Sequence, residues 1–247
     1  MKLLLALLIP FSLFFWSCST VPQTPVYPPS EANPKIFSKY VSNGKSTMMD
    51  SWSRSFDMSG VSFNHKRTCT LITPRHVVMA KHFQRKINST LTFHDRDGYA
   101  IQRTLIKIIP CEGDVAVGLL GRPVPERYTP YPLPSQVANT ASLVGKPIAV
   151  TDQNKLIFFH LIRNIGNGIL SMQYDPESTH GFGKKLISGD SGNPSFVIIN
   201  NELVLMETHL TGGPGAGPYF GDPNIQQSII EAVNTLDPNY NIRTVRF

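Results

Sequence analysis

The residues best suited to chemistry in this 247-residue chain lie in one short stretch, Ile187-Ser188-Gly189-Asp190-Ser191-Gly192-Asn193-Pro194. A serine between two glycines suits an exposed, strained turn, because residues without a Cβ enter positive-φ conformations and let a substrate approach closely. In such a turn the amides of Gly189 and Ser191 are expected to point at one spot, where an oxyanion would develop. A surface Gly-Ser turn without chemistry is the alternative, since clusters of this composition are common in loops.

A serine hydroxyl is a weak nucleophile and needs a base within hydrogen-bond reach. Seven histidines compete for that role: His65, His76, His82, His94, His160, His180 and His209. One candidate is His82, which follows an apolar strand pattern that ends at Ala80. His76 is the nearest rival, but it lies beside Pro74 in an expected hairpin.

A carboxylate is needed to hold the imidazole in the useful tautomer and to stabilise its cation. Asp114 stands at the head of the apolar run Val115–Leu120 and is the expected partner of His82. Asp95 and Asp97 are the alternative carboxylates, but their Asp-Arg-Asp-Gly context is typical of a hairpin loop.

The order His, Asp, Ser and the motifs around these residues resemble the chymotrypsin/trypsin family of serine proteases. Ala80-Lys81-His82 is similar to the family's Ala-His motif, Asp114-Val115-Ala116 to its Asp-Ile-Ala motif, and residues 189–194 to its Gly-Asp-Ser-Gly-x-Pro motif. The resemblance covers Asp57 to Leu236. It implies a serine endopeptidase that acts on protein or peptide substrates through an acyl-enzyme, with His82, Asp114 and Ser191 as catalytic residues and Gly189 and Ser191 as oxyanion hole. No metal or other cofactor is expected.

Two other functions use the same residues. One is a protease-like fold that has lost catalysis and serves as a binding module, although the complete set of His82, Asp114 and Ser191 argues against it. The other is an esterase that uses the same triad on small acyl substrates. Turnover of peptide against ester substrates distinguishes them.

The resemblance also assigns three substrate-binding candidates. The family's primary specificity position lies six residues before the nucleophile, at Lys185, where a lysine would attract an acidic substrate side chain. His209 is expected in the pocket wall, as in glutamyl endopeptidases of this family, where it would share the substrate carboxylate. Thr208 falls where the family keeps a serine that binds the triad aspartate, or it merely packs in its strand. Because no cysteine frames this pocket, Lys185 extending into solvent is the alternative.

We expect no trypsin-style zymogen switch. In the family, the residue matching Asp190 pairs with an amine released at an Ile-Val-Gly-Gly-like site. In this chain, Val41-Ser42-Asn43-Gly44 is only weakly similar to such a site. Since an unpaired buried carboxylate is costly, Asp190 must find another partner, which we expect to be an internal Lys, Arg or polar side chain.

The chain pattern predicts an all-β fold with two six-stranded antiparallel β-barrels packed together and a C-terminal helix. Short runs rich in Val, Ile, Thr and Phe, separated by Gly, Pro, Asn and Asp, indicate strands. The first set is residues 57–63, 67–73, 77–81, 90–94, 103–109 and 114–120, and the second is 147–151, 155–162, 169–174, 195–199, 202–209 and a piece near Tyr219. Apolar residues at helical spacing predict a helix over 224–236, with Asp222 as cap.

The N-terminus has the pattern of an export signal. Lys2 and the apolar run Leu3–Trp16 are typical of a signal peptide and too short for a transmembrane helix. The run ends at Cys18, which resembles the acylated cysteine of a bacterial lipoprotein and would anchor the chain to a membrane. Ordinary secretion with cleavage nearby is the alternative. Both place the protein outside the cytoplasm, as a cell-envelope lipoprotein or a secreted protein.

Composition sets the remaining bounds. The net charge of +6 comes from scattered Lys and Arg, which does not favour nucleic-acid binding. If Cys18 is lipidated, Cys69 and Cys111 remain as a pair whose bonding only geometry decides. The expected organisation is a signal (1–18), a Pro-rich spacer and N-terminal extension (19–54), a first barrel (55–121), a linker (122–134), and a second barrel with the helix (135–247).

Overall fold

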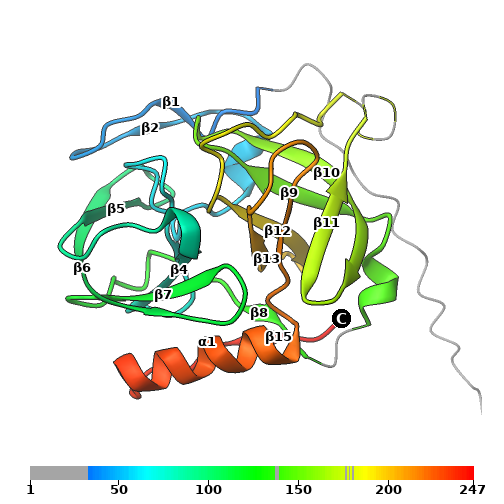
Figure 1. The fold of residues 1–247 in the computed structure, drawn as a ribbon. Helices are drawn as coiled ribbons and strands as arrows, with labels where there is room; N and C mark the ends of the chain where they lie inside the picture. Colours follow the sequence, from blue (N-terminus) through cyan, green and yellow to red (C-terminus); the bar gives the residue numbers. More distant parts are fainter. Residues whose placement is uncertain (1–32, 137–138, 176, 178, 180) are drawn as a thin grey trace, which may run out of the picture.

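The computed structural model describes residues 33–136, 139–175, 177, 179 and 181–247. Two curled antiparallel sheets stand side by side, and one helix, α1 (Pro223–Leu236), runs below them (Figure 1). No helix in this part of the chain is long and apolar enough to cross a membrane. The expected signal, Cys18 and most of the Pro-rich spacer lie outside the described residues.

The N-terminal sheet has five strands in the order β3-β4-β7-β6-β5. Their bounds are Thr70–Leu71 (β3), His76–Ala80 (β4), Thr90–His94 (β5), Ala100–Pro110 (β6) and Val115–Leu120 (β7). The long strand β6 pairs with β5 over its first half and with β7 over its second. A bulge between Leu105 and Lys107 lies near the start of the pairing with β7, and such irregularities bend a strand and increase its twist. This strand therefore curls the sheet.

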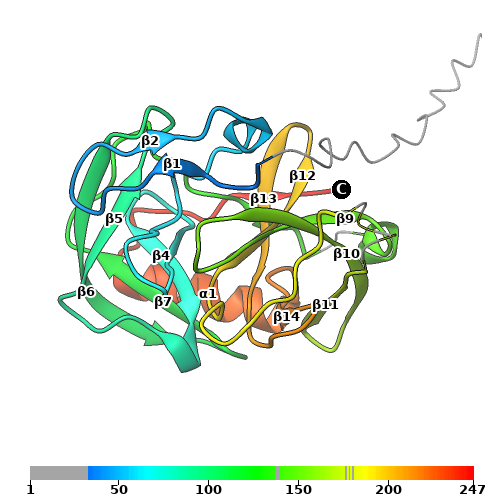
Figure 2. The same ribbon diagram turned by 90° about the horizontal axis from the view of Figure 1, so that it is seen from above.

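The C-terminal sheet has six strands in the order β13-β12-β9-β10-β11-β14. Their bounds are Pro147–Thr151 (β9), Ile157–Gly166 (β10), Ile169–Gln173 (β11), Pro194–Ile199 (β12), Glu202–Thr208 (β13) and Ala216–Pro218 (β14). Here β10 plays the part of β6: it pairs with β9 and with β11, with a register shift between Ile162 and Asn164. Figure 2 shows the two curled sheets from above.

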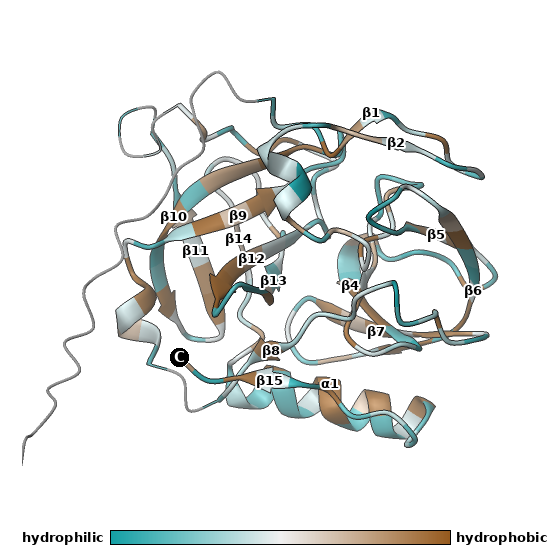
Figure 3. Cartoon of the chain, turned by 180° about the vertical axis from the view of Figure 1, so that it is seen from behind, coloured by the Kyte–Doolittle hydropathy of each residue, from teal (hydrophilic) through white to brown (hydrophobic). Residues whose placement is uncertain are grey.

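Three apolar clusters hold the molecule together. One fills the N-terminal sheet around Leu71, Phe93 and Leu120, and a second fills the C-terminal sheet around Ile148, Met172 and Met206. The largest lies between the sheets and takes in Val117, Phe196 and the buried face of α1. In Figure 3 the apolar colour runs along strands of both sheets. Strand β7 is buried over its whole length because its two faces serve two different clusters.

Short elements connect and border the sheets. They are the hairpin β1 (Phe37–Lys39) and β2 (Thr47–Met48), the 3₁₀ turns at Trp52–Ser55, Lys81–Phe83 and Thr140–Leu143, and the parallel pair β8 (Leu133–Pro134) and β15 (Thr244–Val245). The hairpin and the C-terminal strand β15 were not expected from the sequence.

The expectation of two closed six-stranded barrels is wrong in its details. The N-terminal sheet has five strands, and both sheets are curled half-barrels. The expected first strand, Asp57–Phe63, forms only an isolated bridge from Val61 to Thr70. Here side chains bind backbone groups that would otherwise pair with a neighbouring strand. The Asp57 carboxylate accepts the amide of Ser59, and the Tyr131 hydroxyl donates to the carbonyl of Asp57.

The helix α1 begins as expected. The carboxylate Oδ1 of Asp222 accepts the amides of Asn224 (3.0 Å) and Ile225 (3.2 Å), which would otherwise lack partners at the helix start. The helix then buries Ile225, Ile229 and Val233 in the cluster between the sheets.

Replacing this cap tests its contribution to stability. We expect Asp222→Ala to lower the free energy of unfolding by about 1 kcal/mol, because two helix amides lose their acceptor. Asp222→Asn keeps a side-chain oxygen and should stay close to the wild type. Urea denaturation of the three proteins measures the effect, and an equal loss in both variants would show that the cap is not its cause.

Candidate functional site

His82 and Asp114 are brought together by the pairing of two neighbouring strands. In the β4–β7 ladder Ala80 faces Val115, so the residues just beyond each strand end lie side by side. The backbone amide of His82 donates to Asp114 Oδ1 (2.8 Å), and His82 Nδ1 lies 2.5 Å from Asp114 Oδ2. The imidazole is therefore fixed through its Nδ1 and turns its Nε2 away from the carboxylate. Its side chain is 42% exposed, whereas that of Asp114 is only 13% exposed.

Ser191 lies in a turn immediately before β12, in the other sheet. Gly189 (φ +101°) and Gly192 (φ +82°) flank it in the left-handed region, as glycine permits. The turn packs against the end of β4: a Cβ added to Gly192 would lie 3.5 Å from that of Ala80. A hydrogen bond from Thr68 Oγ1 to Asn193 Oδ1 (2.9 Å) also joins the two halves. Ser191 therefore lies near the end of β4, and His82 follows that strand directly, in the 3₁₀ turn Lys81–Phe83.

The Ser191 hydroxyl and the two backbone amides expected to bind an oxyanion are free of other hydrogen bonds in the described part of the chain. Among the described residues, neither Ser191 Oγ nor the amides of Gly189 and Ser191 have a hydrogen-bond partner. His82 Nε2 makes no bond to Ser191 Oγ, and such contacts are often long until a substrate binds. Two free amides beside a free hydroxyl and a carboxylate-bound imidazole form a set able to support acyl transfer.

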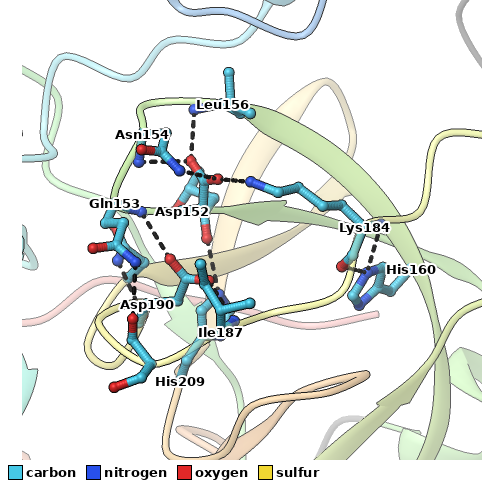
Figure 4. Close-up of polar contacts among 12 residues, drawn as sticks. Asp152, Gln153, Asn154, Leu156, His160, Lys184, Ile187, Asp190 and His209 are labelled. Atoms are coloured by element: carbon cyan, nitrogen blue, oxygen red, sulfur yellow. Dashed lines mark hydrogen bonds and ion pairs between the residues drawn. The ribbon is translucent and has the colours of Figure 1, made fainter.

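Asp190 is 2% exposed, and its carboxylate is satisfied by main-chain amides. Oδ2 accepts the amide of Ile187 (2.8 Å), and Oδ1 accepts the amide of Gln153 (3.2 Å) (Figure 4). The expectation that an internal Lys, Arg or polar side chain would pair with Asp190 is wrong. Val41 is held in its own loop, where its amide donates to Ser46 Oγ and its carbonyl contacts the ring of His94.

Gln153 belongs to a turn built around the fully buried Asp152. The Asp152 carboxylate accepts the amides of Asn154 (2.9 Å) and Leu156 (3.0 Å) and forms an ion pair with Lys184 (Figure 4). The sequence analysis did not find Asp152, Gln153 or Lys184. An Asp-Gln-Asn segment after an apolar strand indicates a turn, but not which loop the turn contacts.

The three expected substrate-binding residues have different surroundings. Lys185 is exposed, as the pocket interpretation and the solvent interpretation both require. Thr208 is buried and its Oγ1 has no hydrogen-bond partner among the described residues, so the expected contact with Asp114 is absent and Thr208 packs in its strand. His209 is 1% exposed, with Nδ1 bound to Glu207 Oε1 (2.8 Å) and Nε2 to the carbonyl of Thr151 (3.0 Å).

His209 therefore cannot share a substrate carboxylate, because both ring nitrogens already have partners. Burial disfavours its charged form, but the neighbouring Glu207 carboxylate outweighs that cost and raises the pKa of His209. Glu207 was also not found from the sequence. This buried pair ties the end of β13 to β9.

The segment before Ser191 is framed by main-chain pairing. Leu186 and Gly213 exchange two hydrogen bonds, of 2.8 and 2.9 Å. A hollow of about 290 Å³ adjoins Asp114 and is lined by Glu112, Ile169, Leu210 and Pro218, among others.

The alternative carboxylate Asp95 and the two cysteines lie in places where they stabilise the fold or are simply buried. Asp95 caps the hairpin after β5 by accepting the amides of Asp97 and Tyr99, as the sequence indicated. Cys69 and Cys111 are separate, buried free thiols rather than a disulfide. Among the described residues, no group of three or more His, Cys, Asp or Glu side chains is arranged to hold a metal ion.

Comparisons with protein-family models and with curated proteins find no match for this chain.

His160 yields a prediction about pH. Its ring is buried between the carbonyls of Pro214 (2.6 Å) and Lys184 (2.8 Å). Burial lowers its pKa to about 4, although the two carbonyls oppose this. In the unfolded chain a histidine titrates near pH 6.5, so on acidification the unfolded state takes up the proton first. Stability is therefore fully present above about pH 6.5 and is lost as the pH falls towards 4.

We expect His160→Gln to reduce this loss by up to about 3 kcal/mol, because a neutral amide does not titrate. Urea denaturation at several pH values between 7 and 4 measures the slope for each protein. His76, whose pKa burial also lowers to about 4, remains in the variant and keeps part of the slope. Parallel curves for wild type and variant would contradict the assignment.

Proposed function

We propose that this protein is a serine endopeptidase of the chymotrypsin-like type, with His82, Asp114 and Ser191 as its triad. The observation that carries the proposal is the double contact of His82 with Asp114, through the backbone amide and through Nδ1, beside the glycine-flanked turn of Ser191. Two curled antiparallel sheets with a C-terminal helix are consistent with this type of fold.

In the proposed reaction, Ser191 Oγ attacks the carbonyl carbon of the scissile bond and His82 Nε2 takes its proton. Asp114 keeps the Nδ1 proton in place and stabilises the imidazolium. The amides of Gly189 and Ser191 donate to the oxyanion of the tetrahedral intermediate. His82 then gives the proton to the leaving amine, and water hydrolyses the acyl-enzyme by the same steps in reverse order.

The esterase alternative uses the same groups and differs only in the leaving group. A catalytically silent binding module is disfavoured because Asp114 already binds His82, while the Ser191 hydroxyl and the amides of Gly189 and Ser191 have no other partner among the described residues. The hollow beside Asp114 offers room for residues of an extended peptide, which favours an endopeptidase over an enzyme for small esters.

Substitution of Ser191 tests the proposal. Ser191→Ala should abolish labelling by a serine-directed phosphonate and lower kcat by about 10⁶-fold, because the acyl-enzyme cannot form. Burst kinetics and mass spectrometry of the labelled protein measure the two effects. Ser142→Ala, an exposed serine outside the site, is the matched control and should behave as the wild type.

Peptide and ester substrates are then compared with the same wild-type preparation. Peptide turnover supports the endopeptidase, and turnover of esters alone supports the esterase. A folded wild type that neither labels nor turns over either substrate would identify a binding module. Labelling that persists in Ser191→Ala would show that the nucleophile is another residue.

For specificity, we propose a preference for an acidic side chain just before the scissile bond, now carried by Lys185 alone. Its exposed ammonium is free to approach a substrate carboxylate, while His209 is held by Glu207 and Thr151. A single exposed charge contributes about 1 kcal/mol, so the preference should be modest.

Peptide-library profiling tests this preference. We expect cleavage after Glu or Asp, weakened about five-fold in Lys185→Ala, since 1 kcal/mol corresponds to roughly that ratio. Lys146→Ala, an exposed lysine remote from Ser191 in the fold, serves as control. Cleavage after Arg or after large apolar residues, unchanged in Lys185→Ala, would contradict the proposal.

A further inference from the structure

Gln153 contacts the Ser191 loop through both its backbone and its side chain. Its backbone amide donates to Asp190, and its side-chain Nε2 donates to the carbonyl of Ser188 (3.0 Å). The same side chain lies against Gly189, where an added Cβ would come within 2.5 Å of Gln153 Oε1. One residue therefore contacts three consecutive positions, 188 to 190, immediately before the nucleophile.

The bond to Ser188 fixes the direction of a catalytically important amide. In a planar trans peptide the C=O and the N–H point in opposite directions. When the Ser188 carbonyl points towards Gln153 Nε2, the amide of Gly189 in the same peptide must point away from Gln153. That amide is one of the two proposed oxyanion donors. If the peptide rotated, its carbonyl oxygen would replace the N–H and repel the oxyanion.

The turn itself is held from two sides. On one side, the buried Asp152 binds two amides of the turn and the ammonium of Lys184. On the other side, the N-terminal segment runs across it: the amide of Ile36 donates to the carbonyl of Lys155 (3.0 Å), and the amide of Ile157 donates to the carbonyl of Pro34 (2.8 Å). The turn that carries Gln153 is therefore anchored by Lys184 and by the segment around Pro34.

We propose that Gln153 is a positioning residue for the reaction: its side-chain amide holds the Ser188–Gly189 peptide in the orientation that presents the Gly189 N–H to the oxyanion. This inference rests on the proposed function. Gln153 does not touch the reacting atoms; it acts through the peptide that does.

Three substitutions separate hydrogen bonding from packing. Gln153→Met keeps the length and volume of the side chain but has no donor, Gln153→Ala removes both, and Gln153→Glu places an acceptor opposite the Ser188 carbonyl. Asn154→Ala is the matched control: it lies in the same turn, and its side chain bonds to Asp152 rather than to the Ser191 loop.

We expect Met and Ala at position 153 to lower kcat by about 10- to 100-fold, and Glu to lower it further, because misdirecting one oxyanion donor costs up to the full value of that donor. KM should stay within about two-fold, since the ground state does not use this amide. Affinity for a peptide boronic acid should fall in parallel with kcat. Asn154→Ala should keep both values, and thermal unfolding checks that every variant is folded.

Crystal structures of the Met and Ala variants give a second readout, in which the Ser188–Gly189 peptide should be rotated. Full kcat in Gln153→Met, or equal losses in Gln153→Met and Asn154→Ala, would overturn the inference while leaving the proposed function intact. A wild type that neither labels nor turns over substrate would overturn the proposed function, and this inference with it.

Discussion

The buried carboxylate of Asp190 is the constraint on which the geometry of the site depends. A charge that is 98% removed from solvent must be paired, or the loop that carries it would not hold its shape. Here the pairing is with two main-chain amides, those of Ile187 and Gln153. The bond to Ile187 closes the Ser191 loop on itself. The bond to Gln153 ties that loop to the Asp152 turn, and the N-terminal segment and Lys184 in turn anchor that turn. The shape of the Ser191 loop is thus set by contacts that reach back to Pro34.

His82 and Asp114 depend on a different constraint, the register of β4 against β7. Both strands are buried throughout, and a slip of one residue would turn apolar side chains from one cluster into the other. The register is therefore fixed by packing. The two hydrogen bonds between His82 and Asp114 follow from this register. The two halves of the site meet where Gly192 packs on Ala80. An added Cβ would make an ordinary van der Waals contact there, so it is the φ of +82° that favours glycine at this position.

The sequence predicted the elements whose patterns are local. Strand β9 was predicted with its observed bounds, and helix α1 with its Asp222 cap, because period and capping chemistry are encoded in neighbouring residues. The pairing of His82 with Asp114 was expected because the motifs that carry the two residues resemble those of the chymotrypsin/trypsin family. Asp57–Phe63 was mispredicted because side chains bind its backbone, and β15 was missed because its two residues pair only through the tertiary fold. The partners of Asp190 could not be predicted, because every residue offers a main-chain amide and no side-chain pattern marks the two used.

Main-chain pairing takes the place of more specialised links around the proposed site. The segment before Ser191 is closed by the Leu186–Gly213 bridge, while Cys69 and Cys111 remain single buried thiols. Asp190 is satisfied by two main-chain amides. Main-chain hydrogen bonds of this kind need neither an oxidant nor a cut in the chain. Each main-chain hydrogen bond contributes only about 1 kcal/mol to stability. The orientation of the Gly189 amide therefore depends on several of these bonds acting together. For the proposed peptidase, the loops around Asp152 and Pro34 would then affect the rate although they do not touch the substrate.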